Sequence, residues 1–344
     1  MKAFVLKANA ELEYASVPDP IEEEGKDILV EVKYSGICGS DIPRAYKSKA
    51  YHYPLIMGHE FSGVVKEAPT SSIYKSGSRV VVFPLLPCYA CAACSTGDFA
   101  QCSDYDYYGS RRDGGFAEQV YVGEANLFAV PETVDLRSAA MTEPCAVALH
   151  GVEKLQVLAG MSALVFGGGP IGNMVAQWLR VKGCDHIYVA DVDKAKLKIA
   201  SDMGFIPIDS ATVDPGEEVK RLEKSDGVDC VVEAVGLPQT FLQATQSAAR
   251  FGQIVFMGNI SGTFQVPEKD FSRILRNEIR ITGTWNSKIV PRGKDEWTRV
   301  LQYLDRGIAV KALISHEVPL SQAAQTFDRV HGKKEWFNKV IFTI

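Results

Sequence analysis

Four of the chain's eight cysteines stand in one short segment, PLLPCYACAACSTGDFAQC, which covers residues 84–102. They are Cys88, Cys91, Cys94 and Cys102, spaced as Cys-x2-Cys-x2-Cys-x7-Cys. Zinc in a tetrahedral site binds four thiolates of this kind, and such a closed set leaves no position for a substrate. The spacing therefore predicts a metal site that holds the loop together, while an iron–sulfur cluster and four unrelated buried thiols remain as alternatives.

A second set of possible metal ligands is spread along the chain and is mixed in type. Cys38 lies in GICGSD, His59 follows it in MGHEFSG, and Glu143 begins EPCAVALH. A catalytic zinc takes about three protein ligands and keeps one position open for a substrate. Taken singly, each residue also fits an ordinary role, as a buried thiol, a hydrogen-bonded core histidine or an acid at the start of a helix. Cys145, two residues after Glu143, competes for the third place.

A glycine-rich turn follows the apolar segment MSALVF and precedes the helical pattern PIGNMVAQW. The motif Gly-x-Gly-x-x-Gly between a strand and a helix is typical of dinucleotide binding. The glycines allow a tight turn and a close approach to the pyrophosphate, while the helix N-terminus faces the phosphates. A glycine-rich turn without a ligand is the alternative, but the strand and the helix on either side favour the cofactor. The predicted cofactor-binding residues of the turn are Gly167, Gly169, Pro170, Ile171 and Gly172.

An acidic residue follows the turn at the end of the next apolar strand, IYVAD. This residue is Asp191, and it follows Gly172 at roughly the 20-residue spacing that is typical of dinucleotide-binding folds. An acid in this position accepts hydrogen bonds from the adenosine ribose, and its charge would repel a 2′-phosphate, so the pattern favours NAD over NADP. Lys196, five residues further on, is a second candidate for contact with the ribose.

The elements that must position these residues change in character near residue 137. Before it, segments such as DILVEVKYSG alternate apolar and polar residues as strands do. After it, apolar strands alternate with helical segments, which predicts βαβ units in a doubly wound parallel α/β sheet of the Rossmann type. The pattern then loosens, and a final strand, NKVIFTI, closes the chain. We therefore expect a catalytic domain made of residues 1–153 and 287–344, with a dinucleotide-binding domain, residues 154–286, between them.

Composition narrows the possible classes of function. The chain has 344 residues, of which 46% are hydrophobic and 23% charged, and its net charge of −5 does not favour a nucleic-acid partner. No apolar run reaches the roughly 18–20 residues that a bilayer span needs, and the N-terminus, MKAFVLKANAELEYA, lacks the pattern of a secretory signal. We therefore expect a cytoplasmic protein with no membrane and no nucleic-acid partner. Its reduced thiols should bind metal rather than pair as disulfides.

The CGSD turn, GHEFSG, the four-cysteine loop and the glycine-rich turn occur in the same order in the zinc-dependent medium-chain alcohol and polyol dehydrogenases, which the whole chain resembles. The resemblance implies a β-rich, GroES-like catalytic domain beside the Rossmann domain, NAD, two zinc ions per chain, and a homodimer or homotetramer. The structural zinc would lie in the four-cysteine loop and the catalytic zinc on Cys38, His59 and Glu143. Glu143 is preferred to Cys145 because EP followed by AVALH resembles the polyol dehydrogenase branch.

The resemblance also implies roles for residues around the catalytic zinc. Ser40 matches the hydroxyl that passes the alcohol proton outward. Glu60 would sit beside the metal, either as a transient ligand or as a residue that orients the ligands. Pro43 stands where the alcohol dehydrogenases have a relay histidine, five residues after Cys38, so the proton is expected to leave by another route, through water.

The substrate implied by the resemblance is a small sugar alcohol, and several motifs favour one that carries a phosphate. CGSDIPR, YHYPLIMGHEFSG, PLLPC, GSRRDGGFAE, GLPQT and GTWN are similar to the members of the family that oxidise a sugar-alcohol phosphate to a ketose phosphate. Arginine suits phosphate oxygens because of its planar fork. The basic candidates are Arg44, Arg111 and Arg112, followed by Lys47, Lys49, Lys288 and Arg292. Oxidation of an unphosphorylated polyol of the sorbitol or L-iditol type, oxidation of a vicinal diol, and a non-catalytic NAD-binding structural protein remain as alternatives.

Overall fold

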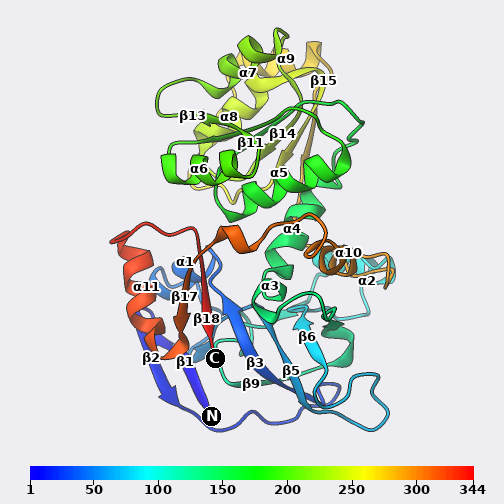
Figure 1. The fold of residues 1–344 in the computed structure, drawn as a ribbon, viewed down its shortest axis with the longest axis vertical. Coiled ribbons are helices and arrows are strands. Elements are labelled where there is room, and N and C mark those ends of the chain that lie inside the picture. The colour runs from blue at the N-terminus through cyan, green and yellow to red at the C-terminus, as the bar shows by residue number, and fades with distance from the viewer. The chain divides into compact units, whose positions relative to one another are not determined.

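The computed structural model describes residues 1–344, which form two compact units. The first unit joins Met1–Pro144 to Lys288–Ile344, and the second is Cys145–Ser287. The chain therefore leaves the first unit once and returns to it for its C-terminal segment. Figure 1 shows the course of the chain, with the C-terminal elements of the first unit in orange and red.

A mixed seven-stranded sheet forms the centre of the first unit. Six of its strands follow the order β10-β6-β5-β3-β18-β17. The remaining strand, β9, pairs with the N-terminal part of β3, whereas β18 pairs with its C-terminal part. Within the sheet only β17 and β18 run parallel to each other, and the C-terminal strand β18 pairs antiparallel with β3 (Figure 1). The bounds are β3 Ile28–Gly36, β5 Glu60–Glu67, β6 Arg79–Val82, β9 Gln119–Val122, β10 Leu127–Ala129, β17 Ile314–Pro319 and β18 Lys339–Thr343.

The alternating pattern of β3 explains why the sheet takes this register. Ile28, Val30 and Val32 are buried on one face together with valines of the neighbouring strands, among them Val80 and Val122. Full burial of each such side chain contributes roughly 1.5–3 kcal/mol. A slip of one residue would turn this apolar set to the other face, so the register of β3 is strongly specified.

A smaller sheet and an aromatic cluster form a second core in the same unit. The sheet has the order β2-β1-β4. Phe4, Phe116, Phe327 and Phe342 are fully buried beside it, and the rings of Phe4 and Phe327 have centroids 5.1 Å apart. The bounds are β1 Lys2–Ala8, β2 Glu11–Ser16, β4 Leu55–Ile56, α1 Asp41–Tyr46 and α11 Ala323–Gly332. The N-terminal and C-terminal segments of the chain thus share one core.

A short antiparallel pair closes the four-cysteine loop. Strand β7 (Leu85–Leu86) pairs with β8 (Asp106–Tyr107), and α2 (Ala92–Ser95) and η1 (Phe99–Gln101) lie between them in the sequence. The other helical segments of this unit are η2 Glu124–Asn126, α3 Leu136–Ala139, α10 Glu296–Tyr303, η3 Lys311–Leu313 and η4 Leu320–Gln322, while α4, Thr142–Val152, crosses the boundary between the units.

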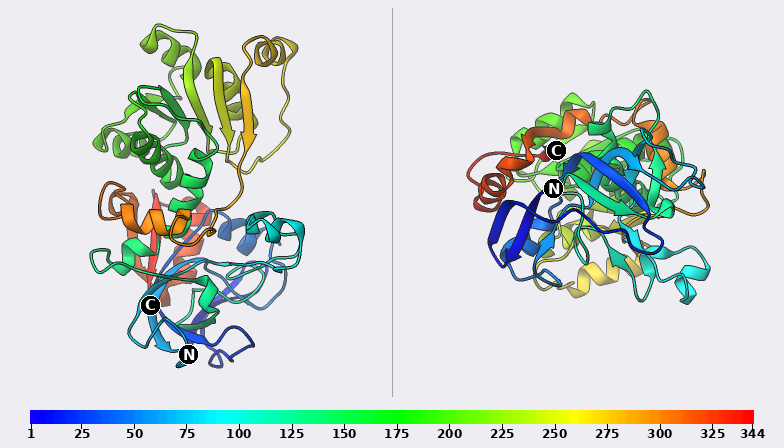
Figure 2. Two further views of the ribbon diagram at one scale, coloured as in Figure 1. Left: turned by 90° about the vertical axis from the view of Figure 1, so that its right-hand side faces the viewer. Right: turned by 90° about the horizontal axis from the view of Figure 1, so that it is seen from below.

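The second unit contains a six-stranded sheet in which all strands run parallel, in the order β13-β12-β11-β14-β15-β16. This order is that of the dinucleotide-binding Rossmann fold, and the prediction of a doubly wound sheet is confirmed. Figure 2 shows the ribbon of this unit in green and yellow. The strand bounds are β11 Ala163–Phe166, β12 Ile187–Asp191, β13 Ile206–Asp209, β14 Val228–Glu233, β15 Ala248–Phe256 and β16 Arg280–Gly283. The helix bounds are α5 Pro170–Lys182, α6 Lys194–Asp202, α7 Pro215–Glu223, α8 Pro238–Ser247 and α9 Glu268–Arg276.

The ends of α5 follow from the local sequence. Pro170 occupies the first helical turn, where its missing N–H costs no hydrogen bond. Gly183 ends the helix with φ of 108°, a left-handed conformation that glycine adopts without strain. Between them Trp178 is buried, and its indole N–H donates to the carbonyl of Cys145 at 3.2 Å. No helix in the structure is both long enough and apolar enough to cross a bilayer.

Candidate metal and dinucleotide sites

The four-cysteine loop brings its thiols into one group. The four sulfur atoms all lie within 4.8 Å of one another. The Cys91 and Cys94 sulfurs are 3.5 Å apart, and those of Cys88 and Cys94 are 4.0 Å apart. Four sulfurs at about 2.3 Å from a tetrahedral zinc would be separated by about 3.8 Å. These thiols are free rather than bonded as disulfides, and their spacing fits a zinc ion.

Backbone N–H groups around the loop favour the thiolate form that binds metal. Those of Ser103 and Cys94 lower the pKa of Cys91 to about 6. The N–H of Cys88 donates to the Cys102 sulfur at 3.3 Å. Such donors orient the sulfurs and offset part of their negative charge, as outer partners of metal ligands do.

Cys38, His59 and Glu60 form a second compact group in the first unit. Their ligand atoms lie within 4.8 Å of one another, although the cysteine and the histidine belong to separate segments of the sequence. The register of the central sheet produces this meeting, because Gly36 at the end of β3 pairs with Glu60 at the start of β5. Cys38 and His59 lie just outside these two strand ends.

Glu143 lies close to this group but outside it. Its side chain is buried at the start of α4, and burial raises its pKa to about 8, with the charges of Glu60 and Cys38 acting in the same direction and His59 opposing them. One carboxylate oxygen, Oε1, accepts a hydrogen bond from the Tyr107 hydroxyl at 3.2 Å. The compact group therefore consists of Cys38, His59 and Glu60, whereas the sequence predicts Glu143 as the third ligand.

The carboxylate of Glu60 is held by a buried lysine. Lys339 in β18 donates from Nζ to Glu60 Oε2 and, at 2.9 Å, to the carbonyl of Ile37. The lysine and glutamate side chains are only 5% and 2% exposed. Gly36 leaves the space for this pair, since a Cβ at that position would lie 2.3 Å from Glu60 Oε2. Any larger residue at position 36 would displace the glutamate.

Asp41 organises the other side of the group. Its Oδ2 accepts from the backbone N–H of Cys38 at 3.0 Å, and its Oδ1 accepts from Arg44 at 2.6 Å. The same Oδ1 lies 3.6 Å from His59 Nδ1, a buried ring nitrogen without a hydrogen-bond partner. Burial chiefly, and also the neighbouring carboxylates, raise the pKa of the Cys38 thiol to about 11, while the Ser40 side chain acts in the opposite direction.

These features fit a bound metal ion. A buried imidazole nitrogen and a buried carboxylate are costly unless they are paired or coordinate a metal. Thiolate, imidazole and carboxylate in one group are the donor types that zinc prefers at catalytic sites. The residues present therefore fit zinc in both places, the four-cysteine loop and the Cys38 group.

The arginines predicted to read a phosphate all have partners within the protein. Arg44 pairs with Asp41 as described above. Arg111 donates to the carbonyl of Tyr105 at 2.5 Å, and its guanidinium also lies 4.7 Å from the centroid of the Tyr51 ring. Arg112 forms an ion pair of 2.9 Å with Asp106. Each of these contacts leaves its arginine with fewer N–H donors for a ligand.

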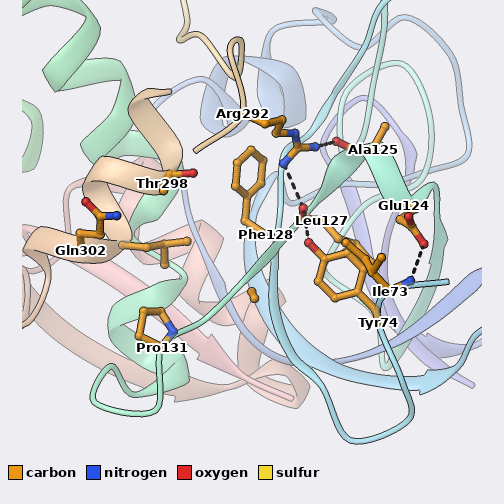
Figure 3. A pocket seen from close by; sticks show the side chains of 12 residues that line it. Ile73, Tyr74, Glu124, Ala125, Leu127, Phe128, Pro131, Arg292, Thr298 and Gln302 are labelled. Atoms are coloured by element: carbon orange, nitrogen blue, oxygen red, sulfur yellow. Dashed lines mark hydrogen bonds between the residues drawn. The ribbon is translucent and has the colours of Figure 1, made fainter. Parts of the chain in front are cut away.

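Two of the further basic candidates are also engaged. Lys288 forms an ion pair with Asp98. Arg292 lies 3.9 Å from the centroid of the Phe128 ring and donates to the carbonyls of Ala125 and, at 3.2 Å, Leu127. It lines a largely apolar hollow of about 630 Å³ in the first unit, shown in Figure 3. None of the predicted metal ligands lines this hollow.

In the second unit the glycine-rich turn is built from close backbone approaches. Gly167 has φ of 103°, and a Cβ on Gly172 would lie 1.7 Å from the Gly167 carbonyl oxygen. Gly169 is the N-cap of α5 and has no heavy atom near its Cβ direction. Asp191 Oδ2 accepts from the backbone N–H of Gly168 at 2.7 Å. The structure thus brings the predicted ribose acid to the turn.

Pro170 and Ile171, the other predicted residues of the turn, form the first positions of α5. Lys196 lies next to the turn as well, because its Cβ is 3.3 Å from the position that a Cβ on Gly168 would occupy. The turn, the acid at the end of β12 and the start of α6 therefore converge at the carboxyl edge of the sheet. This edge is where doubly wound folds bind ligands.

Two residues at the metal group are missed by the sequence pattern. Tyr107 belongs to no motif and comes five residues after the last cysteine of the loop. Lys339 lies in NKVIFTI, an apolar strand, and a lysine within such a strand is the one signal that could have drawn attention to it.

Comparison with known proteins agrees with the fold and with zinc as a cofactor. Residues 24–132 match the alcohol dehydrogenase GroES-like domain, and residues 170–306 match the zinc-binding dehydrogenase family. Galactitol 1-phosphate 5-dehydrogenase of Escherichia coli strain K12 is 31% identical over 329 residues, which cover 94% of this chain and 95% of that protein. Sorbitol dehydrogenase of Halalkalibacterium halodurans is 32% identical over 334 residues, or 94% of each chain.

Among solved structures, galactitol-1-phosphate dehydrogenase from Escherichia coli superposes with a TM-score of 0.93 at 29% identity and full coverage of both chains. The chain therefore belongs to the zinc-dependent medium-chain polyol dehydrogenases. It is an oxidoreductase, and the prediction of a GroES-like domain with a Rossmann domain is confirmed. The alternative of a non-catalytic structural protein is not supported.

Proposed function

We propose that this dehydrogenase oxidises a secondary alcohol of a sugar-alcohol phosphate to the ketose phosphate, with NAD as the hydride acceptor. The reaction is of the type that converts galactitol 1-phosphate to tagatose 6-phosphate. The alcohol loses a hydride to NAD and a proton to solvent, so that ketone and NADH form. The observation that carries this proposal is the likeness to galactitol 1-phosphate 5-dehydrogenase along nearly the whole chain, in sequence and in fold.

In this proposal Cys38, His59 and Glu143 hold the catalytic zinc, and the four cysteines of the loop hold a structural zinc. A zinc ion held by Cys38, His59 and Glu143 would supply a Lewis acid that lowers the pKa of the substrate hydroxyl. Ser40, two residues after Cys38, accepts the hydroxyl proton and passes it toward water. Asp41 orients Cys38 through its backbone N–H.

NAD is proposed to bind at the glycine-rich turn of the second unit. Asp191 is placed at the turn by its hydrogen bond from Gly168, where its carboxylate accepts hydrogen bonds from the ribose hydroxyls. The same charge opposes a 2′-phosphate, which disfavours NADP. Lys196 is the further candidate for contact with the ribose. Residues 1–153 and 287–344 are proposed as the catalytic domain, and residues 154–286 as the NAD-binding domain.

A second candidate function is the oxidation of an unphosphorylated polyol of the sorbitol type. The observation that favours it is the engagement of the arginines, since Arg44 and Arg112 each already form an ion pair within the protein. The sequence identity to sorbitol dehydrogenase is 32%, about the same as the 31% identity to galactitol 1-phosphate 5-dehydrogenase. The proposed substrate is therefore tested directly against its unphosphorylated counterpart.

The test is a set of initial rates with galactitol 1-phosphate, galactitol and sorbitol at low concentration, followed by NADH absorbance. We expect the phosphorylated substrate to have the largest kcat/KM. Since one charge-assisted hydrogen bond contributes on the order of 1.5–3 kcal/mol, the preference should be roughly 10-fold or more. Equal or faster oxidation of galactitol or sorbitol would establish the second candidate instead.

A further inference from the structure

Tyr107 touches two of the three residues proposed to hold the catalytic zinc. Its hydroxyl donates to Glu143 Oε1 at 3.2 Å. Its ring stands edge-on to the His59 ring, with centroids 5.8 Å apart and an angle of 66° between the planes. One side chain therefore contacts both the carboxylate and the imidazole.

The backbone of Tyr107 is held firmly where the four-cysteine loop closes. Tyr107 pairs with Leu85 in the short β7–β8 ladder. Its carbonyl accepts from the N–H groups of Arg111 at 2.9 Å and Ser110 at 3.2 Å. Its own N–H donates to the side chain of Asp106 at 2.7 Å. The backbone that carries the ring is thus held at the point where the loop closes.

The cluster of four cysteine thiols brings the two ends of the loop together near this tyrosine. Cys88 follows Leu85 by three residues, and Cys102 precedes Tyr107 by five. The backbone of Cys88 donates to the Cys102 sulfur at 3.3 Å, so the two ends already meet. A tetrahedral metal bound by the four thiols would fix this closure further.

We propose that Tyr107 is a positioning residue that sets the orientation of the Glu143 carboxylate toward the catalytic zinc. A carboxylate with one oxygen hydrogen-bonded presents its other oxygen in a defined direction. Loss of such an outer partner typically costs about 10–100-fold in metal affinity or activity. The inference rests on the proposed function, because it requires Cys38, His59 and Glu143 to bind the metal.

The experiment compares the zinc-loaded wild-type enzyme with Tyr107→Phe, which removes only the hydroxyl, and with Tyr105→Phe as the matched control. Tyr105 lies on the same segment, but its ring lies against Arg111 rather than at Glu143. Zinc affinity is measured by competition with a coloured chelator, which resolves a labile zinc from a tightly held one. We expect Tyr107→Phe to weaken the labile zinc about 10–100-fold, with the tight zinc and the thermal unfolding unchanged. Tyr105→Phe should match the wild type.

A double-mutant cycle with Glu143→Ala tests whether Tyr107 acts through the glutamate. In the Glu143→Ala background, Tyr107→Phe should produce no further loss of zinc affinity. Equal losses in both backgrounds would show that the tyrosine acts by packing alone and would overturn the inference. If the wild type binds two zinc ions and Tyr107→Phe weakens neither, the inference alone fails. If the wild type binds only the tight zinc, the proposed function fails with it.

Discussion

Among single residues, the buried pair of Lys339 and Glu60 is the most consequential feature beyond the predicted ligands. Both side chains are almost fully buried, and the lysine belongs to β18, the C-terminal strand of the chain. Without the ammonium group, the Glu60 carboxylate would be left beside Cys38 and His59 with an uncompensated charge. The lysine therefore compensates the charge of Glu60 and holds its carboxylate in place.

We expect Lys339→Met to lower the free energy of unfolding of the briefly chelated protein by about 3–5 kcal/mol, the cost of removing one partner of a buried ion pair. Added zinc should recover more stability in this variant than in the wild type, because the metal can neutralise the freed carboxylate. The double variant Lys339→Met with Glu60→Gln should recover most of the loss. Denaturant unfolding with and without zinc checks this. A loss below about 1 kcal/mol would mean that the pair contributes no more than an exposed one.

Among the elements, the turn between β11 and α5 uses its glycines for two separate purposes. Gly172 allows the helix to approach the strand, since a Cβ there would lie 1.7 Å from a backbone oxygen of the turn. Gly169 has open space at its Cβ position and an ordinary φ of −72°. Its proposed role is to let the pyrophosphate approach the backbone. The two roles can be separated by the same small substitution at each position.

Gly172→Ala should destabilise the protein even without cofactor, by about 1–3 kcal/mol as for other overpacked positions. Gly169→Ala should leave the thermal unfolding temperature unchanged and raise the dissociation constant of NADH roughly 10-fold or more, the equivalent of about 1.4 kcal/mol. Thermal unfolding and NADH fluorescence titration measure the two effects. Normal NADH affinity in Gly169→Ala would contradict the proposed place of the pyrophosphate.

For the molecule as a whole, the exposed edge of the parallel sheet bears on assembly. All four residues of β16 are exposed, and α9 presents Phe271 and Leu275 with 55% and 65% of their surfaces exposed. The edge strand leaves backbone N–H and C=O groups without a strand partner, and such an edge invites association. We propose that two copies of the chain pair along β16, giving a homodimer or a homotetramer with closed symmetry.

Sedimentation at micromolar concentration should give at least twice the 37.7 kDa of one chain. Ile281→Lys places a charge on β16 and should shift the mass toward that of a single chain. Ile206→Lys, on the opposite edge strand β13, is the matched control, since the two isoleucines are 39% and 38% exposed. A single-chain mass for the wild type, or an equal effect of both substitutions, would refute pairing along β16.

Features that depend on local geometry could be predicted from short motifs alone. Four thiols within one short loop can meet whatever the rest of the chain does, and the structure places them in one group. A glycine-rich turn between an apolar strand and a helix has few other conformations, and the alternation of strands and helices predicts a parallel sheet. For these reasons the fold class and the family follow from the pattern, and the comparisons confirm both.

Contacts that join distant segments depend on the folded chain instead. The pairing of Gly36 with Glu60 brings Glu60 into the compact metal group, while Glu143 lies just outside it. Lys339 reaches the same group only because β18 pairs with β3. No periodicity in the sequence encodes such a meeting, because strand register depends on the summed burial of whole faces rather than on any local motif. The partners of the arginines are likewise invisible in the sequence, since an ion pair depends on which side chains the folded surface brings within reach.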